Sequence, residues 1–124
     1  MNDGRKYRND YRTPGRLTPR QAFKALSQVK DIPAYLEARG FHNRNWRDYP
    51  ELNPRSADCP VAQYFSWETG LRASVGPWDV GFRKKDSTEL RDELALSLTA
   101  DMTNAVEKFD KEFYSDRPKQ GVLV

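Results

Sequence analysis

The spacing of apolar residues changes along the chain from a helical period to an alternating one, and then back again. Between residues 18 and 40, and again between 56 and 67, apolar side chains recur every three or four positions, which is typical of helices that bury one face. Residues 41–55 between these stretches are rich in Asn and Pro and predict a loop. Residues 71–82 alternate between apolar and polar side chains, as half-buried strands do. Residues 99–113 return to the helical period. Helices and a small antiparallel sheet must share one core, so we expect an α+β fold.

The first helix is expected in the stretch TPRQAFKALSQVK. Thr18 is a good N-cap, Pro19 suits the first helical position, and Gln21 three residues after the cap completes a capping box. The face that this helix would turn toward the core consists of Ala22, Phe23, Leu26 and Val29.

Two more short helices are expected before the alternating segment. DIPAYLEARG predicts a helix that is capped by Asp31 or Ile32 and ended by Gly40 in the left-handed conformation. SADCPVAQYFSW predicts another, capped by Ser56 or Asp58, with a glycine beyond its end. Three N-terminal helices therefore precede the sheet.

The stretches LRASV and WDVGF predict a β-hairpin, because each alternates apolar and polar residues and Gly76-Pro77 between them favours a turn. LALSL, residues 94–98, fits a third strand, but its leucines also fit a helix that begins at Ser87, so both alternatives stay open. The residues expected to face the core from the hairpin are Leu71, Ala73, Val75, Trp78, Val80 and Phe82.

The last element is expected to be an amphipathic helix that Thr99 caps. Its core-facing residues would be Met102, Ala105, Val106, Phe109 and Phe113.

The length of 124 residues fits one domain. We expect a basic, extended or disordered arm at residues 1–17, a single α+β domain at 18–115 and a tail at 116–124. No stretch reaches the ~18 apolar residues that would span a bilayer, and the N-terminus lacks the apolar run of a signal peptide. Cys59 alone cannot form an internal disulfide. These features predict a cytoplasmic protein with no membrane contact.

Two segments together resemble an uncharacterised group of small proteins from actinobacteria and their phages, in which a Cys-Pro-(Leu/Val)-Ala helix, a short hairpin and a C-terminal amphipathic helix follow one another. The resemblance covers about residues 56–114, departs at Ser97 and Thr99, where prolines are common in the group, and favours the strand at 94–98. It implies a phage or bacterial setting and no particular activity. The matching residues are Cys59, Pro60, Val61, Ala62, Leu96, Leu98, Val106, Phe109 and Asp110.

The positive charge is concentrated toward the N-terminus. Residues 1–55 hold twelve Lys and Arg against six Asp and Glu, whereas residues 56–124 hold nine against twelve. Aromatic side chains alternate with the cations, as in proteins that pair phosphates with arginine and stack on bases. The predicted nucleic-acid or partner contacts are Arg5, Lys6, Tyr7, Arg8, Tyr11, Arg12, Arg16, Arg20, Arg39, Arg44, Trp46 and Arg47.

Catalytic chemistry finds little support in the sequence. Cys59 at a helix start and His42, the one histidine, could form a nucleophile and base. A cysteine followed by proline and two apolar residues is more often a small buried hydrophobe. One Cys and one His cannot close a zinc site, and no acidic spacing matches a calcium loop. We expect no enzyme, no catalytic residue, no metal and no cofactor.

Three functions stay open at this point. The first is a non-enzymatic binding protein, of phage or bacterial type, that contacts a nucleic-acid backbone through its basic arm. The second is a phage-type protein that binds and inhibits a host protein, because Tyr, Trp and Arg dominate protein interfaces. The third is a structural subunit of an assembly. The sequence leaves the oligomeric state open.

Overall fold

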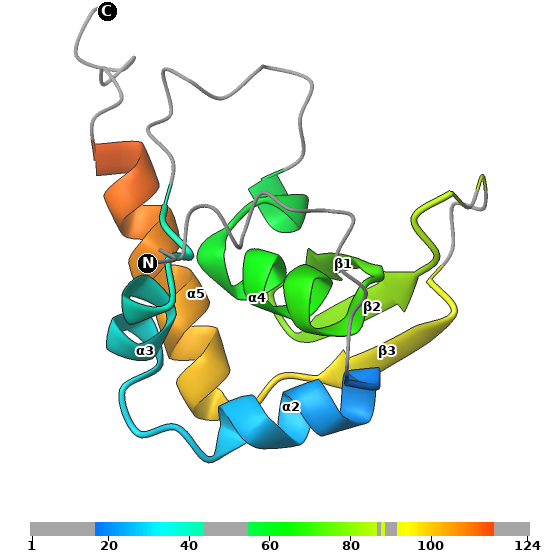
Figure 1. Cartoon of the computed structure of the whole chain (residues 1–124). Coiled ribbons are helices and arrows are strands. Elements are labelled where there is room, and N and C mark those ends of the chain that lie inside the picture. The colour runs from blue at the N-terminus through cyan, green and yellow to red at the C-terminus, as the bar shows by residue number, and fades with distance from the viewer. Residues whose placement is uncertain (1–16, 44–54, 87, 89–91, 116–124) are drawn as a thin grey trace, which may run out of the picture.

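A computed structural model describes residues 17–43, 55–86, 88 and 92–115 of the chain. Helices and a small sheet form the α+β architecture expected from the sequence (Figure 1). Along the chain, the described elements are α2 (Pro19–Ser27), α3 (Ile32–Ala38), the 3-10 helix η2 (Arg55–Ala57), α4 (Pro60–Thr69), β1 (Arg72–Val75), β2 (Asp79–Arg83), β3 (Leu94–Ser97) and α5 (Ala100–Ser115).

The sheet has three antiparallel strands in the order β1-β2-β3. Val80 in the middle strand pairs with Val75 on one side and with Leu96 on the other. The strand alternative at residues 94–98 is therefore right, and the helix from Ser87 is wrong. The alternation decides the structure here, because it lets the leucines of β3 pack against the core while Ala95 and Ser97 stay exposed.

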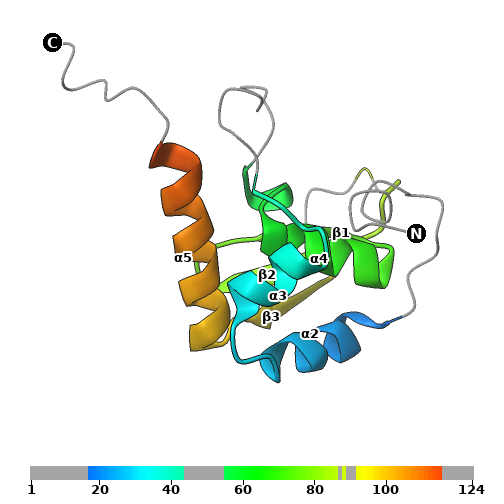
Figure 2. The same ribbon diagram turned by 60° about the vertical axis from the view of Figure 1, so that its left-hand side comes forward.

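Helix α4 is the central element of the fold. It contacts α2, α3, α5, η2 and β1, and Figures 1 and 2 show it lying across one face of the sheet. Phe65 on α4 meets Phe82 on β2 edge to face, with ring centroids 5.6 Å apart. Neighbouring elements surround most of α4, so its N-cap and five of its residues are buried. These residues are Cys59, Pro60, Val61, Ala62, Tyr64 and Phe65.

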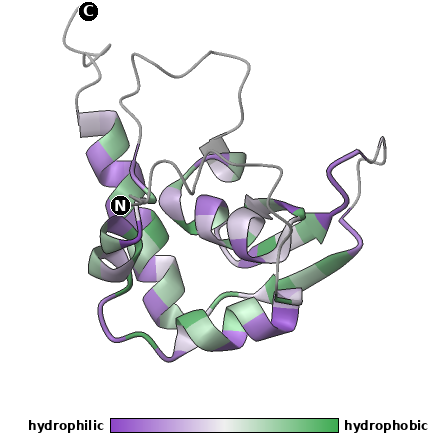
Figure 3. Ribbon diagram, in the orientation of Figure 1, coloured by the Kyte–Doolittle hydropathy of each residue, from purple (hydrophilic) through white to green (hydrophobic). Residues whose placement is uncertain are grey.

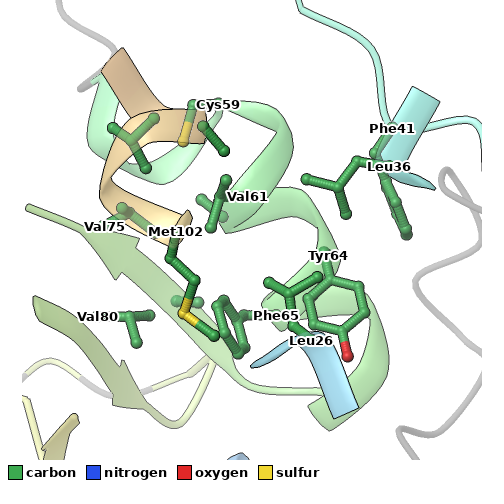
Figure 4. Close-up of a cluster of buried hydrophobic side chains, with 14 of the residues drawn as sticks. Leu26, Leu36, Phe41, Cys59, Val61, Tyr64, Phe65, Val75, Val80 and Met102 are labelled. Carbon is green, nitrogen blue, oxygen red and sulfur yellow. The ribbon is translucent and has the colours of Figure 1, made fainter. Parts of the chain in front are cut away.

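The buried side chains around α4 come from α2, α3, the first two strands and α5 (Figure 4). Met102 reaches the cluster from α5, Val80 from β2 and Leu26 from α2. Tyr64 is 1% exposed, and its hydroxyl donates a hydrogen bond of 2.8 Å to the carbonyl oxygen of Ala22 on α2. The one polar atom of this side chain is thus satisfied inside the core, as a buried phenol requires.

Helix α5 buries all five residues that its sequence pattern assigned to the core. The backbone N–H of Met102 donates to the hydroxyl of Thr99, 3.2 Å away, which confirms the predicted cap. Figure 3 shows the resulting division of α5 into a hydrophobic and a hydrophilic face. Helix α3 packs against the same helix, so α5 closes one side of the core.

The predicted starts of the first two helices are confirmed. Thr18 and Gln21 form the full capping box, with N–H to oxygen distances of 3.1 and 2.9 Å in the two directions. Asp31 caps α3 by accepting from the N–H of Ala34 at 3.1 Å. Gly40 follows α3 with φ of 89°, which a residue with a side chain rarely adopts.

The predicted cap of α4 is wrong. Its N-cap is Cys59, which makes no side-chain capping bond, and neither Ser56 nor Asp58 takes that position. Ser56 lies within η2, and the chain turns between η2 and α4. Pro60 opens α4 and has no N–H to satisfy, so the helix needs one capping partner fewer.

Trp78 does not face the core, although the alternating pattern places it there. Its side chain is 79% exposed. The hairpin turn is longer than expected, because Gly76 donates its N–H to the carbonyl oxygen of Asp79 and β2 begins only at Asp79. Trp78 is therefore a turn residue. The outer face of β2 also differs from a simple polar face, since Gly81 is buried beneath the side chain of Asp92.

Candidate nucleic-acid interface and a polar pocket

Most of the predicted contact residues lie outside the described part of the chain. This group comprises Arg5, Lys6, Tyr7, Arg8, Tyr11, Arg12, Arg16, Arg44, Trp46 and Arg47. The described part of the chain begins at Leu17, whose N–H donates to the carbonyl oxygen of Glu68 at 3.0 Å. The predicted arm thus joins the folded part beside the C-terminal end of α4.

Arg20 lies in the first turn of α2 with its side chain exposed. Among the predicted contacts that lie outside the arm, Arg20 is the nearest to it in sequence. A guanidinium here is accessible to a phosphate, and it extends the basic segment onto the folded part.

Arg39 is bound within the fold. Its guanidinium donates to the Tyr35 hydroxyl at 2.9 Å, lies 2.6 Å from a carboxylate oxygen of Glu68, and sits over the rings of Tyr35 and Phe41. Burial acts to lower the pKa of Arg39, but the hydrogen bond that Arg39 donates to Tyr35 and the charge of Glu68 outweigh it, so the pKa is raised. The side chain keeps about a third of its surface exposed (35%). Arg39 therefore links α3 to α4 as well as presenting a partly exposed cation.

The charge of the chain is divided unevenly between the described residues and the rest. The described residues carry eleven Lys and Arg against twelve Asp and Glu, so their formal net charge is −1. The other residues carry ten against six, a formal net charge of +4. The excess positive charge thus belongs to the segments that the sequence predicts as arm and tail, since residues 1–16 hold five cations against two acids and residues 116–124 hold two against one.

Cys59 and His42 occupy different environments. Cys59 is 2% exposed and belongs to the hydrophobic core, whereas His42 is exposed. A buried thiol at a helix start packs as a small hydrophobic side chain. Among the described residues, no group of three or more His, Cys, Asp or Glu side chains is placed to hold a metal ion.

No helix in the described ranges is both long enough and apolar enough to pass through a bilayer.

A pocket of about 450 Å³ opens between α4, β1 and the segment around η2. One side is formed by Gln63, Ser66 and Trp67 of α4, whose spacing of three and four residues puts them on one stripe of the helix. This stripe lies opposite the core-facing residues Val61 and Phe65. The same helix therefore builds the core with one face and the pocket with the other.

Hydrogen bonds fix the polar side chains of the pocket. The Gln63 amide donates from Nε2 to the carbonyl oxygens of Asp58 at 2.7 Å and His42 at 3.0 Å. Its Oε1 is buried and has no hydrogen-bond partner among the described residues. The Ser66 hydroxyl accepts the N–H of Ala73 from strand β1 at 3.1 Å. The two backbone carbonyls thus set the orientation of the Gln63 amide.

Charged side chains of both signs line the same pocket. Arg72 from β1 and Lys85 from the loop after β2 supply cations, and Asp58 supplies a carboxylate. Sequence reasoning missed all of these residues. The stripe of Gln63, Ser66 and Trp67 was a usable signal, but nothing in the local sequence indicates that Lys85 returns to α4.

A second hollow of about 360 Å³ lies between the hairpin turn and α5. Pro77 and Tyr114 border it together with the carboxylates of Glu107 and Asp110. Tyr114 is 45% exposed, and the exposed Trp78 is the next residue after Pro77. We call Pro77, Trp78 and Tyr114 the hairpin-tip surface.

Comparisons of the chain with protein-family models, with curated proteins and with solved structures found no match.

Proposed function

We propose that the protein is a non-enzymatic, nucleic-acid-binding protein of phage or bacterial type. Its basic arm neutralises backbone phosphates, and the folded part supports the arm. The supporting observation is the division of charge, since the described residues are nearly neutral and the remaining ones carry a formal net charge of +4. Phosphate contacts by Lys and Arg bind without reading sequence, so the binding is expected to be unspecific and sensitive to salt.

A deletion of residues 1–16 tests this function. Binding of labelled duplex DNA, single-stranded DNA and RNA is measured by fluorescence anisotropy at low salt. The deletion ends before Leu17, which holds the start of the folded part to Glu68. We expect the shortened chain to lose most of its affinity, because five of the Lys and Arg residues leave with the arm.

The matched control replaces Lys108 and Lys111 with glutamine, which lowers the charge on exposed positions of α5. This variant should keep most of its affinity. Equal binding by the full and shortened chains, or no binding by the full chain, would contradict the proposal.

A second function, binding of a host protein, is favoured by the hairpin-tip surface. Trp78 is 79% exposed. Tryptophan is among the most frequent anchors of protein interfaces, so an exposed one is suited to bind a partner. If this function holds, Trp78→Ala weakens binding to one protein and leaves nucleic-acid affinity unchanged. A role as a structural subunit predicts instead that the chain alone forms oligomers in size-exclusion chromatography.

A further inference from the structure

The hairpin-tip surface combines exposed aromatic side chains with a hollow. Among the described residues, the large hydrophobic side chains that are exposed are Trp78, at 79%, and Tyr114, at 45%. Tyr114 borders the hollow of about 360 Å³, and Trp78 directly follows Pro77, which also borders it. Exposed aromatic rings gathered beside one hollow are typical of a surface that binds a partner.

The charge around this hollow is negative. Glu107 and Asp110 are the charged residues in its described lining, and both are acidic. A third carboxylate lies at the same place, because Gly76 also lines the hollow and a Cβ added to it would meet Oδ1 of Asp79 at 3.4 Å. The surface is therefore acidic although the whole chain has a formal net charge of +3. Complementary charge favours a cationic partner.

We propose that the hairpin-tip surface binds an arginine-bearing peptide segment of a partner protein. A guanidinium group is attracted to the face of an indole ring and also pairs with carboxylates. Trp78 supplies the ring, and the exposed side chains of Glu107 and Asp79 supply carboxylates that pair with no cation among the described residues. The inference rests on the second function above, binding of a host protein, and names the chemistry of that partner.

The basic arm of the same chain is a less suitable occupant. Leu17, where the described part begins, is held to the carbonyl oxygen of Glu68 near the C-terminal end of α4. The hollow lies at the opposite end of that helix, because Cys59, the N-cap of α4, lines it. A helix of ten residues is about 15 Å long. The arm is thus attached away from the hairpin-tip surface, which favours a separate partner.

Three labelled peptides test the chemistry of the partner. One alternates glycine with arginine, and the other two carry lysine or glutamine in place of arginine. Binding to the full chain is measured by fluorescence anisotropy at low salt. We expect the arginine peptide to bind most tightly and the lysine peptide about threefold more weakly, because a guanidinium stacks on an indole better than an ammonium does. The glutamine peptide should not bind.

Substitutions at exposed positions test the surface itself. Trp78→Ala should weaken binding of the arginine peptide about tenfold, whereas Trp78→Phe keeps a ring and should lose less. Glu107→Gln should weaken binding about threefold. Asp86→Asn is the matched control, because it removes the same charge from an exposed position outside the lining of the hollow. All these side chains are exposed, so the core stays intact.

Several outcomes would overturn the inference. These are equal binding of the arginine and glutamine peptides, no binding at millimolar concentration, or unchanged binding by Trp78→Ala. If Trp78→Ala weakens binding to a whole protein while no arginine peptide binds, the second function holds and the assigned chemistry is wrong. A peptide with the sequence of residues 4–16 that binds more tightly than the arginine peptide would assign the surface to the chain's own arm and overturn its assignment to a partner.

Discussion

At the scale of single residues, polar groups in this fold are stabilising only where a specific partner meets them. Tyr64 shows this most clearly, because its ring is buried among Phe41, Tyr35 and Phe65 while its hydroxyl donates to the carbonyl oxygen of Ala22. Burial raises the pKa of Tyr64, since the ionised phenolate would lose its hydration inside the core. The core therefore depends on the neutral phenol.

The raised pKa makes a prediction about stability at high pH. Below the unfolded pKa of about 10 both states keep the proton, and the stability that the neutral phenol contributes is fully present. As pH rises above that value, the unfolded chain ionises first, so the free energy of unfolding falls by up to about 1.4 kcal/mol per pH unit for this group. Tyr64→Phe should remove that part of the decline.

Chemical denaturation of both chains between neutral pH and high pH measures the effect. At neutral pH the variant should be less stable by about 1 kcal/mol, because the bond to Ala22 is lost. Parallel pH profiles of the parent and Tyr64→Phe would show that Tyr64 ionises as easily in the folded state as in the unfolded state.

At the scale of elements, local sequence signals decide where helices begin when the side chains can reach the backbone. The Thr18 capping box could be predicted because cap and partner are three residues apart and interact only with each other. The start of α4 could not, since η2 occupies the preceding residues and Cys59 caps without a side-chain bond. Likewise the exposure of Trp78 depends on the length of the hairpin turn, which the alternating pattern does not encode.

The capping box predicts a measurable contribution to stability. Thr18→Ala removes the hydroxyl that accepts the N–H of Gln21, and should lower the free energy of unfolding by about 1 kcal/mol. Thr18→Ser keeps the acceptor and should cost little. Urea denaturation of the three chains at neutral pH makes the comparison. If the alanine and serine variants lose the same amount, the hydroxyl bond contributes nothing and the methyl group of Thr18 is responsible.

At the scale of the whole molecule, the α+β class, the hairpin of β1 and β2 and the core face of α5 could be predicted because they follow from the hydrophobic period. The period left the third strand open, because the leucines of residues 94–98 also fit a helix. The pocket beside α4 could not be predicted from the sequence, because it depends on where Lys85 and Arg72 lie relative to α4. Such a contact is set by tertiary packing. The predicted contacts Arg20 and Arg39 are placed by the structure, one exposed and one bound to Glu68, while the other predicted contacts lie outside the described residues.

Our central claim is that the basic arm binds nucleic acid through phosphate contacts, while the nearly neutral folded part does not. The most direct measurement is the dependence of affinity on salt, for the full chain and for the chain without residues 1–16. With six cations between residues 1 and 20, the slope of log affinity against log salt for the full chain should reach at most about −5, so that a fourfold rise in salt costs about a thousandfold in affinity. The shortened chain should bind weakly with a slope near −1. A full-chain affinity that does not change with salt would contradict the claim.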